Sequence, residues 1–261
     1  ARAFFADLEC VIIDEAHALA PSKRGDLLSL ALARVQSFAP RHRRIGLSAT
    51  VSHPDSLARW IAPDADIVTA PAGAAPIVDV IDTQARIPWS GHSGRHLMAD
   101  VYAAIKTART ALVFVNTRAQ AELTFQELWR INDDNLPIAL HHGSLDVVQR
   151  SRVESAMTQG VLRAVVCTST LDLGIDWGDV DLVIQMGAPK GASRLIQRIG
   201  RANHRLDEPS RALIAPTNRF EVLECKAAQD AVAAGAQDAI SARTGALDCL
   251  AQHIMGCACG V

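Results

Sequence analysis

The chain lacks a strong charge bias and any long hydrophobic run. Its 26 basic and 28 acidic side chains give a formal net charge of −2. The total charge therefore gives no argument for nucleic-acid binding, and any basic surface must be local. No apolar run reaches the roughly 18 residues that a membrane helix requires, and no signal-peptide pattern is visible. These absences favour a cytoplasmic protein.

Paired metal-ligand spacing is also missing. The chain contains six cysteines, at positions 10, 167, 225, 249, 257 and 259. Cys257 and Cys259 lie near His253, which makes a metal site an alternative, but no second pair of ligands accompanies them. The spacing favours reduced thiols in helices of a cytosolic protein.

Length and patterning predict an α/β protein. A chain of 261 residues suits about two average domains, and its hydrophobic content of 49% can fill real cores. Short apolar segments alternate with helical segments, which is typical of parallel sheets with crossover helices. The expected strands are 10–13, 43–47, 66–69, 111–115, 138–141, 162–167, 182–185 and 212–215.

Composition predicts the domain boundaries. The first α/β block covers residues 1–70, and the Pro- and Gly-rich segment 71–94 predicts an interdomain connection with one strand around 77–81. Alternation resumes over 95–217, which predicts a complete second α/β domain. The segment 218–261 is alanine-rich and predicts helices over 220–234 and 245–256.

The most informative motif is Asp14-Glu15-Ala16-His17, which follows the apolar run Val11-Ile12-Ile13. A short apolar run that ends in two carboxylates predicts a buried parallel strand that delivers acids to the edge of a sheet. Ligands of open α/β sheets bind at that carboxyl edge. Two acids there suit Mg²⁺-nucleotide chemistry, since one can hold the metal and the other can orient or deprotonate a water.

Two further motifs follow expected strands. Ser48-Ala49-Thr50 comes directly after 43–47, so its hydroxyls can bond the neighbouring acidic loop. Asn116-Thr117-Arg118 comes after 111–115, at the start of a helix that Asn116 or Thr117 can cap. The exposed backbone N–H groups and Arg118 can hold a phosphate. A plain cap with a solvated arginine is the alternative for this motif.

Hydroxyl-rich and histidine-rich segments follow two more strands. The hydroxyls of Thr168-Ser169-Thr170 can contact a nucleic-acid backbone, and Asp176 can accept from a ribose hydroxyl. A Ser/Thr cap followed by a turn is the alternative. For His141-His142-Gly143-Ser144 the alternatives are a metal site, a strand-end loop that touches phosphate, and a histidine of the core.

The strongest local concentration of positive charge surrounds the run Gln197-Arg198-Ile199-Gly200-Arg201-Ala202-Asn203-His204-Arg205. Residues 190–211 hold six basic and two acidic side chains. Arg198 and Arg201 share a helix face if the helix continues that far. A planar guanidinium that stays charged is suited to a γ-phosphate. A solvated basic turn is the alternative.

Taken in order, these segments resemble motifs II, III, IV, V and VI of superfamily 2 helicases, over residues 10–205. Longer phrases resemble the Lhr (large helicase-related) family, and within it most of all the ligase-associated DEXH-box helicases of bacteria. The phrases are Ser22-Lys23-Arg24-Gly25, Pro88-Trp89-Ser90-Gly91-His92, 114–118, 140–144, 173–181, 187–191 and 197–205.

The resemblance implies an ATP-dependent 3′→5′ DNA helicase that acts in repair, in the bacterial cytosol or nucleoid. It implies two RecA-like domains followed by a winged helix. Residues 1–70 would be the C-terminal part of the first RecA-like domain, 95–217 the second, and 218–261 a helical linker with the start of the winged helix. The implied cofactors are ATP and Mg²⁺. The implied partners are single-stranded or tailed duplex DNA, with a DNA ligase and a nuclease.

The resemblance also implies roles for individual residues. Asp14 would bind Mg²⁺ through water, Glu15 would activate the attacking water, and His17 would couple the nucleotide site to Ser48-Ala49-Thr50. Gln197 would help to position that water.

Arg201 would be an arginine finger, with the second finger open between Arg198 and Arg205. Gly174 and Asp176 would lie on the nucleotide side, with Asp176 by the sugar. The nucleic-acid track would be lined by Asn116, Thr117, Arg118, His142, Thr168 and Ser169.

One part of the helicase pattern is missing. The chain contains no Gly-Lys dipeptide, and therefore no Gly-x-x-x-x-Gly-Lys-Ser/Thr loop to cradle phosphates. We therefore expect a fragment that starts just before motif II and is inactive as an ATPase alone. Two alternatives remain: an RNA or RNA:DNA helicase, or, for this chain as expressed, only a nucleic-acid-binding module.

Overall fold

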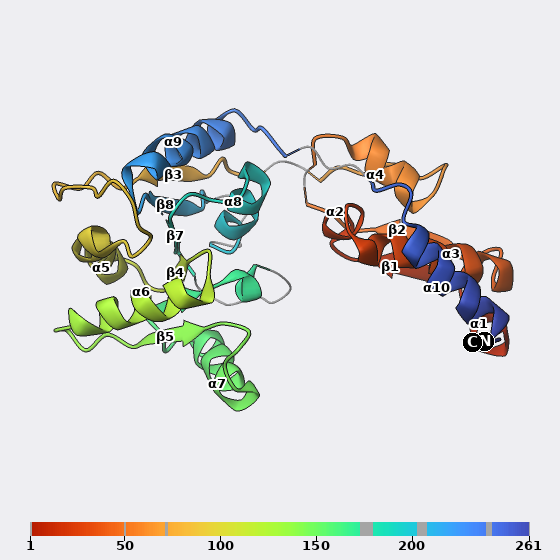
Figure 1. Ribbon diagram of the computed structural model, residues 1–261, viewed down its shortest axis with the longest axis horizontal. Helices are drawn as coiled ribbons and strands as arrows, with labels where there is room; N and C mark the ends of the chain where they lie inside the picture. The colour runs from red at the N-terminus through yellow and green to blue at the C-terminus, as the bar shows by residue number, and fades with distance from the viewer. Residues whose placement is uncertain are drawn as a thin grey trace. The chain divides into compact units, whose positions relative to one another are not determined.

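The computed structural model describes residues 2–49, 51–70, 73–172, 180–202, 208–238 and 242–260. The chain forms two compact units (Figure 1). Unit 1 combines Ala1–Ala70 with Gln237–Val261, and unit 2 is Pro71–Ala236. Within the described residues, no helix is long and apolar enough to cross a membrane.

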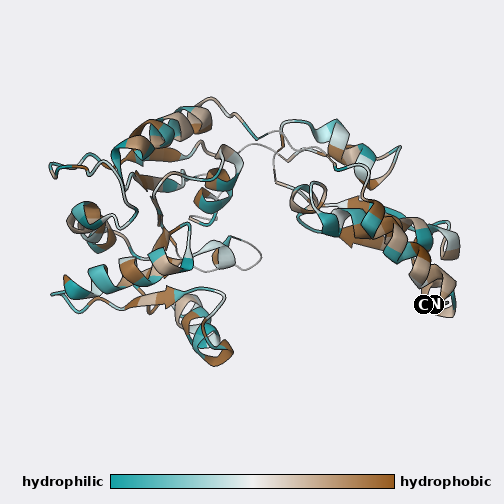
Figure 2. Ribbon diagram, in the orientation of Figure 1, coloured by the Kyte–Doolittle hydropathy of each residue, from teal (hydrophilic) through white to brown (hydrophobic). Residues whose placement is uncertain are grey.

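Unit 2 is built on a six-stranded sheet in which all neighbouring strands are parallel, in the order β3-β8-β7-β4-β6-β5. This confirms the expected α/β class with parallel sheets. Most residues of these strands are hydrophobic (Figure 2). The strands are β3 (Ile77–Val80), β4 (Ala111–Phe114), β5 (Ile138–His141), β6 (Ala164–Cys167), β7 (Leu182–Met186) and β8 (Arg211–Ala215).

Helices cover both faces of this sheet, so its inner strands are buried on both sides. In β4, Ala111 and Val113 belong to the core shared with α5 and α6, while Leu112 and Phe114 belong to the core shared with α7, α8 and α9. This is the period-2 alternation of a strand between two layers. The helices are η1 (Arg95–Leu97), α5 (Met98–Thr107), α6 (Arg118–Arg130), α7 (Val147–Thr158), η2 (Ser169–Leu171), α8 (Ala192–Ile199) and α9 (Arg219–Ala233).

The segment expected to be an interdomain connection belongs to unit 2. Its strand β3 pairs with β8 along the edge of the sheet, from Ile77↔Arg211 to Val80↔Ile214. Directly after this segment, Arg95 donates to Glu127 of α6 at 2.6 Å. Arg95, together with Arg130, lowers the pKa of the Glu127 carboxyl. The Pro and Gly content of the segment indicated a connection. It could not show that β3 belongs to the sheet, because its partner β8 lies far away in the sequence.

Unit 1 contains a two-stranded parallel sheet of β1 (Cys10–Ile13) and β2 (Arg43–Gly46). Its core includes Ile13, Ala16, Leu32, Leu57 and Ile61. The helices of the unit are α1 (Arg2–Phe5), α2 (Ala16–Leu19), α3 (Lys23–Phe38), α4 (Pro54–Ile61) and α10 (Leu247–Ala258).

Three expectations for unit 1 are wrong. The run Val11-Ile12-Ile13 is buried only at Ile13, since Ile12 is 64% exposed, and β2 is largely exposed. Residues 66–69 form no strand, and Val68 in that segment is 94% exposed. The physical reason is that β1 and β2 pack against helices on one face only, and 66–69 has no strand partner.

Helix α10 packs on α3 within unit 1, and its expected place at the start of a winged helix stays a prediction. Lys23 forms an ion pair with Asp248, and Arg243 forms one with Asp26 at 3.7 Å. Cys249 is buried in this contact and lies 4.0 Å from the carbonyl oxygen of Lys23. The C-terminal helix therefore supports the helix that follows the acidic motif.

Gly25 lets α2 and α3 approach closely, so its substitution should destabilise unit 1. A Cβ at Gly25 would lie 2.2 Å from the carbonyl oxygen of Leu19, and the atoms that would have to move are backbone atoms. We expect Gly25→Ala to cost about 1–3 kcal/mol, as for overpacking. Hydrogen exchange of the α3 amides measures this loss.

Gly256→Ala is the matched control, because Gly256 lies inside α10 of the same unit and a Cβ there meets nothing within 4 Å. That variant should be neutral or more stable by up to about 1 kcal/mol. Equal effects of the two substitutions would contradict the close approach at Gly25.

Candidate functional site

The acidic motif leaves β1 in a fixed turn. Leu47 donates its backbone N–H to Ile13 at 2.8 Å, and Ala16 donates to Leu47 at 2.9 Å, so the exits of β1 and β2 are hydrogen-bonded to each other. Glu15 has φ 51° and ψ 42°, a left-handed conformation that is uncommon for a residue with a side chain. Such backbone strain is typical of functional positions.

His17 connects the acidic motif to Ser48 and Ala49. Its imidazole is only 5% exposed. Nδ1 accepts from the backbone N–H of Ala49 at 3.3 Å and lies 3.2 Å from the Ser48 hydroxyl. Nε2 lies 3.5 Å from Oε2 of Glu15. Because Nδ1 is an acceptor, the neutral ring carries its proton on Nε2, which faces the Glu15 carboxylate.

The two carboxylates fit the oxygen ligands that Mg²⁺ prefers. Asp14 is exposed, and its Oδ1 accepts from the backbone N–H of Glu15 at 2.8 Å. Glu15 is half-buried, with its side chain 32% exposed. Among the described residues there is no group of three or more His, Cys, Asp or Glu side chains that could by itself hold a metal. A metal at Asp14 would therefore need oxygens of water or of a phosphate.

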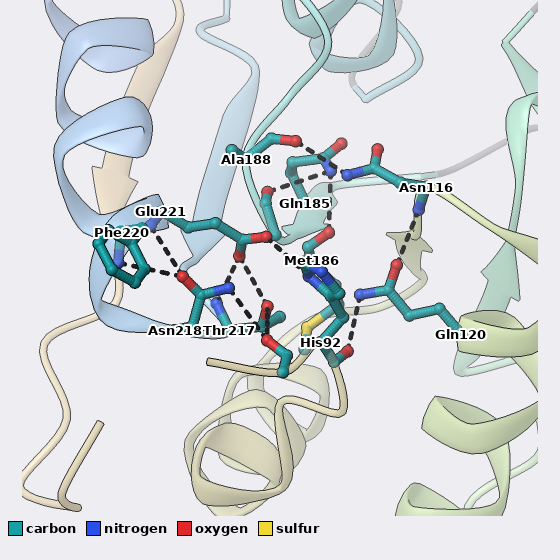
Figure 3. Close-up of polar contacts among 12 residues, drawn as sticks. His92, Asn116, Gln120, Gln185, Met186, Ala188, Thr217, Asn218, Phe220 and Glu221 are labelled. Carbon is teal, nitrogen blue, oxygen red and sulfur yellow. Dashed lines mark hydrogen bonds and ion pairs between the residues drawn. The ribbon is translucent and has the colours of Figure 1, made fainter. Parts of the chain in front are cut away.

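In unit 2, the motif after β4 caps α6 through Thr117, and Asn116 ties two strand ends together (Figure 3). The Thr117 hydroxyl accepts from the backbone N–H of Gln120 at 3.2 Å. Asn116 donates from Nδ2 to the carbonyl of Ala188 at 2.9 Å, which links the ends of β4 and β7. Gln120 accepts from Asn116 N–H and donates to the carbonyl of His92. The capping interpretation of Thr117 is confirmed, and the amide of Asn116 is engaged by the protein.

The same edge contains a network that sequence reasoning missed (Figure 3). Glu221 of α9 accepts from the backbone N–H and the hydroxyl of Thr217, at 2.9 and 2.7 Å, and lies 3.1 Å from Nδ1 of His92. Asn218 caps α9 and donates to the carbonyl of Gly91. The network fixes the loop 88–92 on the carboxyl edge of the sheet. The available signal was Asn218 followed three residues later by Glu221, a capping pattern.

Thr117, Arg118 and Ser169 are exposed residues of the expected nucleic-acid track. Arg118 is exposed and donates to the hydroxyl of Ser144. Ser169 is exposed and Thr168 is half-buried. His142 is only 3% exposed, which favours the core-histidine alternative for its side chain, and the contact of its loop with phosphate stays a prediction. Its ring instead accepts from the backbone N–H of Ser144 at 3.3 Å.

Arg198 is a structural arginine of the core and is unsuited to act as a finger. It is only 2% exposed, and its guanidinium lies 4.7 Å from the ring centroid of Phe114. Nε donates to Asp172 at 2.9 Å and Nη1 donates to Gln185 at 2.5 Å. The assignment of Arg198 as a candidate second finger is therefore wrong, because its donors are used within the protein. Gln185, a lone polar residue in an apolar strand, was the signal for this partnership.

Gln197 and Arg201 remain on accessible positions. Both are half-buried, and Arg201 donates from Nη2 to the backbone carbonyl of Asp172 at 2.8 Å. Its Nε is buried without a hydrogen-bond partner among the described residues. Thr50, Gly174, Asp176 and Arg205 lie outside the described residues.

Three of the cysteines, Cys167, Cys225 and Cys249, are buried. All six are free thiols. Burial raises the pKa of the Cys225 thiol to about 12 and raises that of Cys167 well above its ordinary value. Buried thiols of high pKa are unreactive. Cys10 and Cys167 lie in strands, so the expectation that the cysteines lie in helices holds only for others of the six.

Two family models match the chain. The model described as DEAD/DEAH box helicase matches residues 1–57, and the helicase conserved C-terminal domain matches residues 95–205. The first range contains the acidic motif and Ser48-Ala49-Thr50. The second contains the motifs at residues 116–118, 141–144, 168–176 and 197–205.

Relatives match nearly the whole chain. The ATP-dependent helicase Lhr-Core protein 2 of Thermococcus barophilus is 37% identical over 95% of this chain, and the Lhr helicase/probable uracil glycosylase of Mycolicibacterium smegmatis is 32% identical over 99%. The chain spans 30% and 20% of their respective lengths.

A solved structure agrees with this placement. The helicase Lhr of Mycobacterium smegmatis, bound to ssDNA and AMP-PNP, has a TM-score of 0.88 and 34% identity, over 99% of this chain and 35% of that one. The DUF1998 helicase MrfA bound to DNA, with a TM-score of 0.79 at 17% identity, shares the fold. From its motifs, its fold and these likenesses, the chain belongs to the Lhr family of superfamily 2 helicases.

Proposed function

We propose that this chain is the part of an ATP-dependent DNA helicase that carries the acidic motif and the second RecA-like domain. The full-length protein couples ATP hydrolysis to 3′→5′ movement on single-stranded DNA in repair. The observation that carries the proposal is the buried His17, which contacts Glu15 on one side and Ser48 and Ala49 on the other. A change at the nucleotide can reach the exit of β2 through this ring.

ATP and Mg²⁺ are the proposed cofactors. Bound Mg²⁺ would supply charge neutralisation at the phosphates. Asp14, through water, is the proposed holder of the metal, and Glu15 the proposed acceptor of a proton from the attacking water. Gln197 and Arg201 are proposed to serve the same nucleotide from unit 2. The chain contains no Gly-Lys dipeptide to hold the phosphates, so we propose that it does not hydrolyse ATP alone.

Single-stranded or tailed duplex DNA is the proposed partner. Arg118, Thr117 and Ser169 are exposed near the carboxyl ends of β4 and β6, where N–H groups, hydroxyls and one guanidinium can bind phosphates. The ssDNA complex of the Mycobacterium smegmatis relative supports this choice over RNA. A DNA ligase and a nuclease are further proposed partners, on the family resemblance alone.

The function is tested by comparing the full-length protein with the 261-residue chain. We expect the full-length protein to hydrolyse ATP when single-stranded DNA is added and to displace a strand only from substrates with a 3′ tail. The 261-residue chain should show no ATP turnover. Equal unwinding of RNA duplexes would contradict the choice of DNA as the substrate. DNA-stimulated ATP turnover by the 261-residue chain would refute its proposed inactivity.

A further inference from the structure

Two adjacent buried histidines connect the motif after β4 with the motif after β6. We propose that His141 and His142 are positioning residues, which hold the Arg118 guanidinium and the turn Thr168–Thr170 at a fixed spacing for the phosphates of one bound strand. This inference rests on the proposed nucleic-acid function of unit 2.

His141 fixes the hydroxyl turn. Its ring is 2% exposed, with Nδ1 at 2.9 Å from the Thr170 hydroxyl and Nε2 at 3.0 Å from Oε1 of Glu154 on α7. An ionised carboxylate can only accept, so Nε2 carries the proton and Nδ1 accepts from Thr170. The backbone agrees, since Thr168 N–H donates to the carbonyl of His141 at 3.3 Å. The turn after β6 is thereby held by its side chain and its backbone to the end of β5.

His142 fixes the loop that contacts Arg118. Its Nδ1 accepts from Ser144 N–H at 3.3 Å, and its Nε2 lies 3.4 Å from Oε1 of Glu122 on α6. The Ser144 hydroxyl in turn accepts from Arg118. The ring therefore sets the position of Ser144, and Ser144 restrains the arginine from outside the helix that carries it.

The two imidazole rings are less accessible to a bound nucleic-acid strand than the groups that they hold. Both histidines are buried, whereas Arg118, Ser144 and Ser169 are exposed. The histidines therefore cannot contact phosphate, and they act through the exposed groups. Their place next to each other at the end of β5 gives both motifs one common support.

The test substitutes each histidine with Asn and with Gln, because each of these amide side chains mimics one nitrogen of the imidazole ring. The side-chain oxygen of Asn can accept near the position of Nδ1, while Gln reaches only toward the position of Nε2. His142→Asn therefore keeps the acceptor for Ser144, and His142→Gln loses it. The same logic separates His141→Asn, which keeps Thr170, from His141→Gln, which keeps only Glu154.

Binding is measured with the 261-residue chain and a labelled oligothymidylate, by anisotropy over a salt series. Each lost phosphate contact should lower the slope of log K against log salt by about 0.7 for a single strand. We expect Arg118→Ala and His142→Gln to lower it by this amount, with binding about 3- to 10-fold weaker. His142→Asn should bind nearly as the unmodified chain does. The His141 pair should show the same order in affinity but with an unchanged salt slope, because the hydroxyls that His141 holds carry no charge.

A double-mutant cycle tests whether His142 acts through Arg118. Adding His142→Gln to Arg118→Ala should weaken binding little further, because the group that the ring positions is already gone. Ser144→Ala is a variant at an exposed position that leaves the buried groups intact, and it should lower the salt slope as His142→Gln does.

The outcomes separate the two proposals. If the unmodified chain shows no salt-dependent binding, the proposed nucleic-acid function of unit 2 fails. If it binds and Arg118→Ala weakens binding, but the Gln variants bind as the unmodified chain does, the positioning role is overturned. It is also overturned if the Asn and Gln variants lose affinity equally and in proportion to lost thermal stability, since that is the signature of a purely structural role.

Discussion

Replacing Glu15 with Gln is expected to lower the ATP turnover of the full-length protein by about 10²- to 10⁴-fold, the range for loss of a general base. The amide keeps the size of the side chain but cannot take a proton from water. Asp14 and the backbone of the turn remain in place, so ATP binding should be largely intact. Turnover is measured with saturating single-stranded DNA, and nucleotide affinity by equilibrium binding.

The matched control is Glu9→Gln, the same chemical change at an exposed acid just before β1. It should leave turnover and binding unchanged. His17→Asn is an informative intermediate, because its oxygen can still accept from Ala49 N–H while the contact with Glu15 is lost. Unchanged ATP turnover in Glu15→Gln would contradict the assignment of this carboxylate as the general base.

Removing the guanidinium of Arg198 is expected to destabilise unit 2 by about 3–5 kcal/mol, the cost of leaving one partner of a buried ion pair alone. In Arg198→Leu, Asp172, which is only 5% exposed, loses the guanidinium closest to it, and Gln185 loses the donor to its side-chain oxygen. Hydrogen exchange of the β4 and β7 amides reports on unit 2 separately from unit 1.

Arg194→Leu removes another guanidinium from the same carboxylate. Arg194 lies 3.8 Å from Oδ2 of Asp172, but its side chain is 46% exposed, so the expected cost is below about 1 kcal/mol. The contrast between the two leucine variants isolates burial as the cause. If Arg198→Leu kept full stability and lost only ATP turnover, the buried residue would act as a finger after all.

The sequence predicted local features well where a motif and its strand are adjacent. The acidic motif, the Thr117 cap and the strand at Ile77–Val80 could be found because apolar runs and capping residues are local signals. The burial of Arg198 could not be found in this way. Its partners are 13 and 26 residues away in the chain, and a basic residue beside Arg201 looks the same in sequence whether it faces a phosphate or a carboxylate.

The two helices expected near the C-terminal end are present, but the sequence did not indicate where the second of them packs. A helix over residues 245–256 was expected and α10 is present at Leu247–Ala258, but its attachment to α3 depends on Lys23 and Asp26, more than 200 positions earlier. Pairing of exposed charges over such separations leaves no periodic pattern. Strand 66–69 was predicted from apolar content alone, and it fails because a strand also needs a neighbour with which to bond.

The backbone passes between the two units twice, after Ala70 and after Ala236. In topological terms unit 2 is an insertion within unit 1, closed by the return of α10 to α3. If the backbone is cut at only one crossing, unit 2 stays covalently joined to part of unit 1 through the other crossing. Two cuts are therefore needed to release unit 2.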